Sequence, residues 1–197
     1  MGTMTLAESD PDDEVIGKHR TNTAIRSVVI SCALIACGAG SQPGFTAVDS
    51  AAGAVPFDTV DKGAVVVLPD TVGICQRRTD HLRPKNSHTL TLLLVDVDRD
   101  AGVRESAPMA PGTYSVQTGT FAPDHWALAD FDVSDAQCKT LSYGSATAGT
   151  VTLTKAAQGA WAGTMNLTFA DGGVVTGSFD APNCPALEAD AGVLACD

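Results

Sequence analysis

Hydrophobic and polar residues alternate through much of the chain, in short stretches separated by Gly- and Asp-rich turns. A period of two places successive side chains on opposite faces of an extended strand. Between the last two stretches, Asp171-Gly172-Gly173 predicts a hairpin turn. Two earlier stretches are more continuously apolar, which is typical of strands buried on both faces. The predicted strands cover residues 64–68, 89–97, 111–116, 126–133, 149–154, 161–169 and 175–179.

This pattern predicts an all-β domain over residues 55–197, folded as an antiparallel β-sandwich or small barrel with one short helix. Asp70 and Thr71 can cap that helix. The domain is long enough for one hydrophobic core, which we expect Trp126 and Trp161 to anchor. Residues 37–54 are rich in Gly, Ala, Ser and Pro, and predict a flexible tether before the domain.

The first 36 residues have the pattern of an export signal. An apolar run over residues 27–36 follows three basic residues, and it is too short to span a bilayer. An acidic stretch over residues 8–14 precedes the basic region, an order that is unusual in such signals. We therefore expect translation to start near Val15.

Residues 34–37, Leu-Ile-Ala-Cys, are followed by Gly38 and resemble the lipobox of bacterial lipoproteins. The resemblance implies cleavage before Cys37, whose sulfur carries a diacylglycerol with acyl chains such as palmitate, so that the mature chain is anchored to a membrane. Gly38 replaces the aspartate that retains lipoproteins at the inner membrane, which favours the outer membrane. The mature part is similar to small β-rich envelope lipoproteins, a resemblance that implies no particular activity. An ordinary secretory signal is the alternative.

Four cysteines remain when the leader and the lipobox are set aside: Cys75, Cys138, Cys184 and Cys196. An even number in an exported domain predicts two disulfides. Because a short loop closes at a lower entropic cost, the spacing favours Cys184–Cys196 together with Cys75–Cys138. The other two pairings stay open.

The chain carries a net charge of −11, which argues against a nucleic-acid partner. Against this background a basic, proline-containing loop is predicted over residues 77–88. Its cations are candidates to bind an anionic glycolipid, a lipid headgroup or an acidic envelope protein, and a charged loop that is only solvated is the alternative. They are Arg77, Arg78, Arg83 and Lys85.

Asp96, Asp98 and Asp100 alternate at the end of a predicted strand, as the first ligands of a calcium loop do. The twelfth position of such a loop is Ala107 and not a bidentate glutamate, so the pattern is incomplete. A calcium-stabilised adhesion domain is therefore kept as an alternative, and otherwise no cofactor is expected.

Catalytic motifs are weak. The chain has no GxSxG nucleophile elbow, and its serines, histidines and aspartates follow no familiar catalytic order. His81, His88 and Asp80 are candidates for a site only if the loop folds back. We expect a non-enzymatic binding or structural module of the cell envelope. The alternative is an envelope hydrolase or metal-dependent enzyme assembled from scattered residues.

Overall fold

The structure is a computed structural model that describes residues 45–56, 61–97, 109–118, 124–157, 160–188 and 194–197, all within the compact unit Cys37–Asp197. It has an all-β architecture with little helix, as the alternation predicts. The helical segments are α1 (Ile74–Thr79) and the 3-10 turn η1 (Pro185–Leu187). The strands are β1 (Ala51–Pro56), β2 (Asp61–Pro69), β3 (Leu82–Arg83), β4 (His88–Val97), β5 (Gly112–Val116), β6 (His125–Ser134), β7 (Thr140–Ala157), β8 (Ala160–Phe169), β9 (Val174–Pro182) and β10 (Ala195–Cys196).

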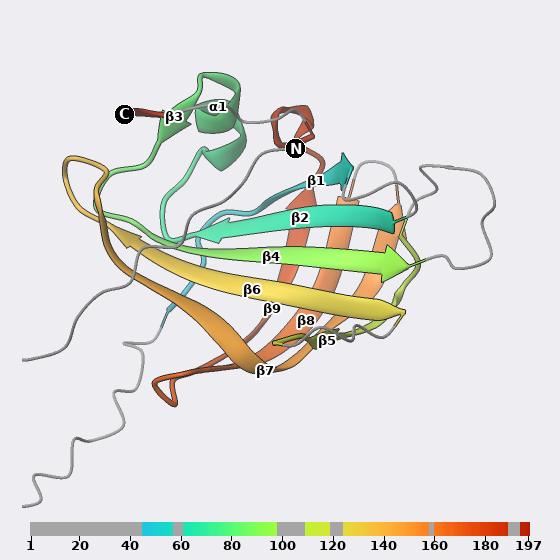
Figure 1. Ribbon diagram of the computed structural model, residues 1–197. Coiled ribbons are helices and arrows are strands. Elements are labelled where there is room, and N and C mark those ends of the chain that lie inside the picture. Colours follow the sequence, from blue (N-terminus) through green and yellow to red (C-terminus); the bar gives the residue numbers. More distant parts are fainter. Residues whose placement is uncertain (1–44, 57–60, 98–108, 119–123, 158–159, 189–193) are drawn as a thin grey trace, which may run out of the picture. The chain divides into compact units, whose positions relative to one another are not determined.

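Eight of these strands form one curled sheet in the order β1-β2-β4-β6-β5-β7-β8-β9 (Figure 1). Sheet neighbours run antiparallel except β5 and β6, which are parallel. The two edge strands meet at one point, where Ala52 bridges Asn183 and accepts a hydrogen bond from the Cys184 N–H at 2.6 Å. Where the sequence predicts a sandwich or a small barrel, the structure has a single sheet that bends back over itself.

Strand β7 makes the bend possible because it pairs with β6 first and with β5 and β8 further along. A register irregularity lies between Ala146 and Ala148, and Gly149 follows it with φ of +124°. A Cβ on Gly149 would lie only 2.1 Å from the carbonyl oxygen of Asn166 on β8. Glycine is thus required where the strand turns and its neighbour approaches closely.

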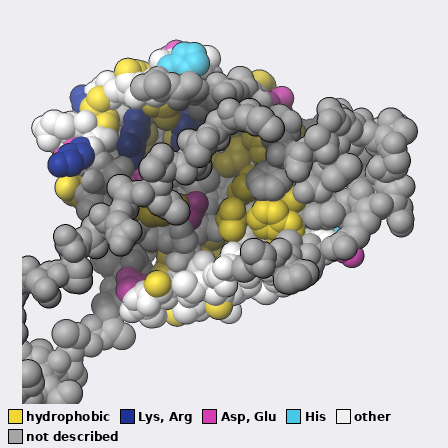
Figure 2. Space-filling model, in the orientation of Figure 1, with side chains coloured by type: hydrophobic (Ala, Val, Ile, Leu, Met, Phe, Trp, Pro, Cys, Tyr) yellow, Lys and Arg dark blue, Asp and Glu magenta, His cyan; other side chains and the backbone are white. Residues whose placement is uncertain are grey.

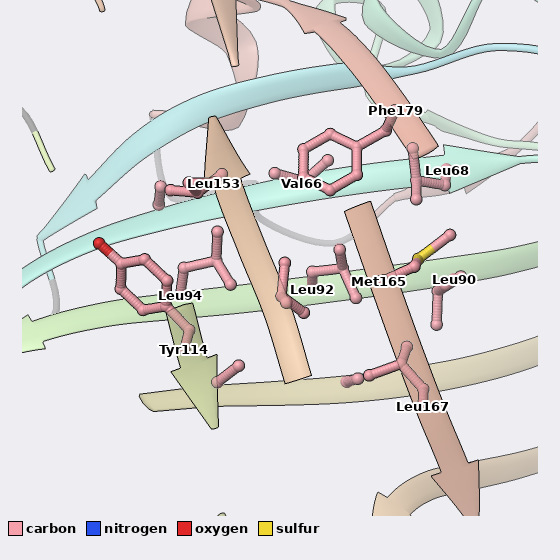
Figure 3. Packing of buried hydrophobic residues seen from close by; sticks show 14 of the residues in the cluster. Val66, Leu68, Leu90, Leu92, Leu94, Tyr114, Leu153, Met165, Leu167 and Phe179 are labelled. Carbon is pink, nitrogen blue, oxygen red and sulfur yellow. The ribbon is translucent and has the colours of Figure 1, made fainter. Parts of the chain in front are cut away.

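The main core lies inside the curl. Figure 3 shows side chains of β2 and β4 facing those of β7, β8 and β9. The strands β7, β8 and β9 cross β2 and β4 at a steep angle. On each strand these are alternate residues, as the period of two requires. The labelled members are Val66, Leu68, Leu90, Leu92, Leu94, Tyr114, Leu153, Met165, Leu167 and Phe179.

A second, smaller cluster lies on the outer face of β1 and β2. Ala51 and Val67 project outward from the sheet and pack against Ile74 of α1 and Leu187 of η1. Cys184 is fully buried in this cluster and forms a disulfide with Cys75 on α1. The short helix is therefore fixed to the sheet by apolar packing and by a covalent bond.

Three expectations about the secondary structure and the core need correction. Residues 51–54, predicted as tether, belong to β1, and Ala51 and Ala52 are fully buried. Residues 77–79 of the predicted loop lie in α1. Trp161 is buried in the core as expected, whereas Trp126 lies outside the core cluster, because its neighbour Ala127 takes the inward position on β6.

The prediction of two disulfides is confirmed, but the favoured pairing is wrong. The bonds join Cys75 to Cys184 and Cys138 to Cys196. Sheet curvature is the physical reason, since it brings the end of β9 beside β1 and α1 and places Cys184 next to Cys75. Cys196 instead lies on β10, which runs parallel to β3 near the β6–β7 turn that carries Cys138.

Candidate functional site

The predicted basic residues gather around α1 and β3, at the end of the sheet where β2 and β6 finish (Figure 1). Helix α1 begins after Gly73, whose φ is +80°, and the first helical N–H, from Ile74, donates to the Asp49 carboxylate at 2.9 Å. Together with the Cys75–Cys184 disulfide, this contact fixes the helix at both its start and its buried face. Arg77 and Arg78 are thus presented on a helix that is fixed to the sheet.

Arg77 is neutralised by the C-terminal residue. Its guanidinium forms an ion pair with the Asp197 carboxylate, and its Nε donates to the Val72 carbonyl at 3.3 Å. The Asp197 N–H donates to the Arg83 carbonyl at 3.1 Å, and the Cys138–Cys196 disulfide fastens the same segment.

Arg83 is neutralised from the sheet. Its guanidinium pairs with the Asp132 carboxylate on β6 and donates to Thr140 Oγ1 at 2.8 Å, at the start of β7. The second carboxylate oxygen of Asp132 is buried and has no hydrogen-bond partner. This arginine therefore serves first to join β3 to the sheet.

Arg78 differs from both neighbours. Its side chain is partly buried, its Nε has no hydrogen-bond partner, and none of the ion pairs among the described residues involves it. Burial lowers the pKa of its guanidinium, and the nearby charge of Arg83 lowers that pKa further. Arginine stays charged even so, and a buried charge without a partner is costly. A planar guanidinium in this state is suited to bind a phosphate, sulfate or carboxylate.

Lys85 is exposed on the loop between β3 and β4, and the described residues make no hydrogen bond or ion pair with its side chain. Lys139 is also exposed, in the β6–β7 turn beside Cys138. Figure 2 shows Lys and Arg side chains on the side of the molecule that carries α1 and β3, with hydrophobic side chains beside them.

Replacing Arg78 with methionine should stabilise the domain in the absence of a ligand. The change keeps the apolar stem and removes an unpaired, partly buried charge, so we expect the free energy of unfolding to rise by about 1 kcal/mol. For a domain of this size that corresponds to a rise in Tm of about 2–4 °C. Thermal unfolding followed by circular dichroism measures it. A loss of stability would mean that Arg78 has a structural partner.

The aspartate series is only partly described. Asp98 and Asp100 lie outside the described residues, so calcium binding stays a prediction. Asp96 pairs with His125, with 3.2 Å between Oδ1 and Nδ1, and the Ala110 N–H donates to its other oxygen at 3.5 Å. Burial raises the pKa of the neighbouring Tyr114 phenol, and the charge of Asp96 raises it further. In the part of the chain that the structure describes, no three metal-ligating side chains cluster.

The histidines of the basic segment do not converge with Asp80. His81 is exposed, and the Asp80 carboxylate accepts a hydrogen bond from Gln76. His88 instead contacts Asp70, with 2.6 Å between its ring Nδ1 and Oδ2 of Asp70. The backbone N–H of His88 donates to Oδ1 of the same carboxylate at 2.9 Å. Sequence reasoning missed this pair, because only the pairing of β2 with β4 brings the two residues together.

None of the described helices is long and apolar enough to cross a membrane. No family model matches the chain, and comparisons with curated proteins and with solved structures find no match either.

Proposed function

We propose that this protein is a lipid-anchored component of the cell envelope that acts without catalysis, as a module that binds an anionic group through Arg78. One observation carries the proposal: a partly buried guanidinium beside a second arginine, with no carboxylate paired to it among the described residues. Structural arginines are normally paired, as Arg77 and Arg83 are here. The unpaired state of Arg78 is typical of a site that a ligand completes.

The anchor rests on the lipobox-like residues 34–37, which lie outside the described residues. The two disulfides support export, because such bonds persist in oxidising compartments and are rare in the cytosol. A module held at a membrane also needs only modest affinity, since tethering raises the local concentration of any ligand on the same surface.

Titration with inorganic phosphate and with pyrophosphate tests the binding site. Hydrogen bonds to a charged group are worth about 1.5–3 kcal/mol, so Arg78→Met should weaken binding by about 10- to 100-fold. Isothermal titration calorimetry on the mature protein provides the affinities.

Arg77→Met is the matched control, because it removes the same charge one residue away, where Asp197 already neutralises it. It should change the affinity by less than about twofold. Equal losses in the two variants, or no saturable binding of either anion by the native protein, would contradict the proposal.

A further inference from the structure

We propose that the end of the domain carrying α1, β3 and the β6–β7 turn rests on the bilayer that holds the anchor, so that the anionic group at Arg78 is a lipid phosphate. This inference rests on the proposed function and names the ligand class of the same site. It follows from where the chain enters the domain, which side chains are exposed there, and how the charges are distributed.

The chain enters the domain at this end. Phe45 packs edge-on against Phe131 of the core, with 5.2 Å between the ring centroids. The Val48 N–H then donates to the carbonyl of Pro69 at the end of β2, and Asp49 reaches the start of α1.

Only residues 38–44 separate Phe45 from the predicted lipidated Cys37. Even fully extended, eight residue steps reach at most about 29 Å, so this end of the sheet cannot move far from the membrane surface. The tether therefore allows this end of the domain to reach ligands in the headgroup layer.

The same end exposes four large apolar or aromatic side chains. Val72 precedes α1, and its carbonyl accepts the hydrogen bond from Arg77. Tyr143 lies opposite Asp132, the partner of Arg83, and Leu141 is two residues earlier on the same strand. The exposed fractions are 56% for Val48, 69% for Val72, 65% for Leu141 and 63% for Tyr143.

Such a surface fits the membrane interface. Aliphatic side chains enter the boundary of headgroups and acyl chains, tyrosine places its hydroxyl in the polar layer, and arginine and lysine meet phosphates. Asp132 and Asp197 neutralise Arg83 and Arg77, so this end is not strongly basic as a whole. Attachment thus depends on apolar insertion and on one specific phosphate contact at Arg78, and not on a general positive field.

The experiment uses lipidated mature protein in vesicles of phosphatidylcholine and phosphatidylglycerol, with bromine on the acyl chains as a fluorescence quencher. Leu141→Trp places a reporter at the proposed contact. Thr154→Trp is the matched control, because Thr154 is exposed on the same strand but thirteen residues further along it. A side chain that enters the interface by about 5–10 Å should lose about half of its emission, while the control should lose no more than the native tryptophans. Equal quenching at the two positions, or none at either, would overturn the inference.

A second readout identifies the source of the phosphate. Inorganic phosphate should bind the vesicle-attached protein about tenfold more weakly than the same protein in dodecyl maltoside, because headgroups already occupy Arg78. Equal affinities would show that the site faces water and would overturn the inference, while leaving the proposed binding function intact. Failure of the native chain to float with vesicles would instead count against the anchor itself.

Discussion

Replacing Cys75 and Cys184 together with alanine should lower the free energy of unfolding by about 4–5 kcal/mol. The bond closes a loop with a sequence separation of 109 residues, and restricting so long a loop removes much of the entropy of the unfolded chain. It also fixes α1, and with it Arg78, to the outer face of the sheet. Guanidinium chloride unfolding without reductant measures the change.

Removal of the other disulfide is the matched comparison. Cys138 and Cys196 close a loop with a separation of 58 residues, for which the same entropy argument gives about 4 kcal/mol. Cys196 is exposed on a two-residue strand, so its release should free the C-terminus and leave α1 in place. A loss below about 1 kcal/mol in the Cys75/Cys184 variant would show that apolar packing alone holds the helix.

Replacing Cys37 with serine should abolish membrane attachment. The proposed diacylglycerol is attached to the thiol, and each buried methylene of its acyl chains contributes about 0.8 kcal/mol, so its loss leaves only a weak surface contact. Fractionation of cells that produce the native protein or the Cys37→Ser variant provides the measurement. The native protein is expected in the membrane pellet, and the variant in the soluble fraction.

Cys32→Ser is the matched control, because this cysteine lies in the predicted leader and should not affect attachment. Retention of the Cys37→Ser chain in the membrane, with its leader removed, would contradict lipidation at this position.

The strands that could be predicted are those with a large apolar side chain at every second position. Leu90, Leu92 and Leu94 show why: each faces the core, and the pattern follows directly from the pleat. Strand β1 was missed because its first four residues, on both faces, are alanine or glycine. The reason is close packing, since a Cβ on Gly53 would lie 2.9 Å from the Cβ of Leu187.

The sequence was enough to predict which basic residues form the candidate site, but not which of them are paired with carboxylates. The cluster of Arg77, Arg78 and Arg83 stands out in an acidic chain, and the structure keeps the three arginines on neighbouring elements. Arg83 and Arg77 are paired with Asp132 and Asp197, which are far from them in the sequence. The register of β6 places Asp132 beside Arg83, and the Cys138–Cys196 disulfide holds the segment that carries Asp197. The prediction of the disulfide pairing was wrong for a similar reason: it used the length of the closed loop, and loop length does not show which distant segments a curled sheet brings together.

The most direct measurement is the intact mass of the protein purified from the membrane fraction. The expected mass is that of a chain that begins at residue 37, with the added mass of acyl chains on that cysteine and two disulfides elsewhere. A chain that retains residues 1–36, with an unmodified thiol at position 37, would contradict the anchor and the membrane contact built on it.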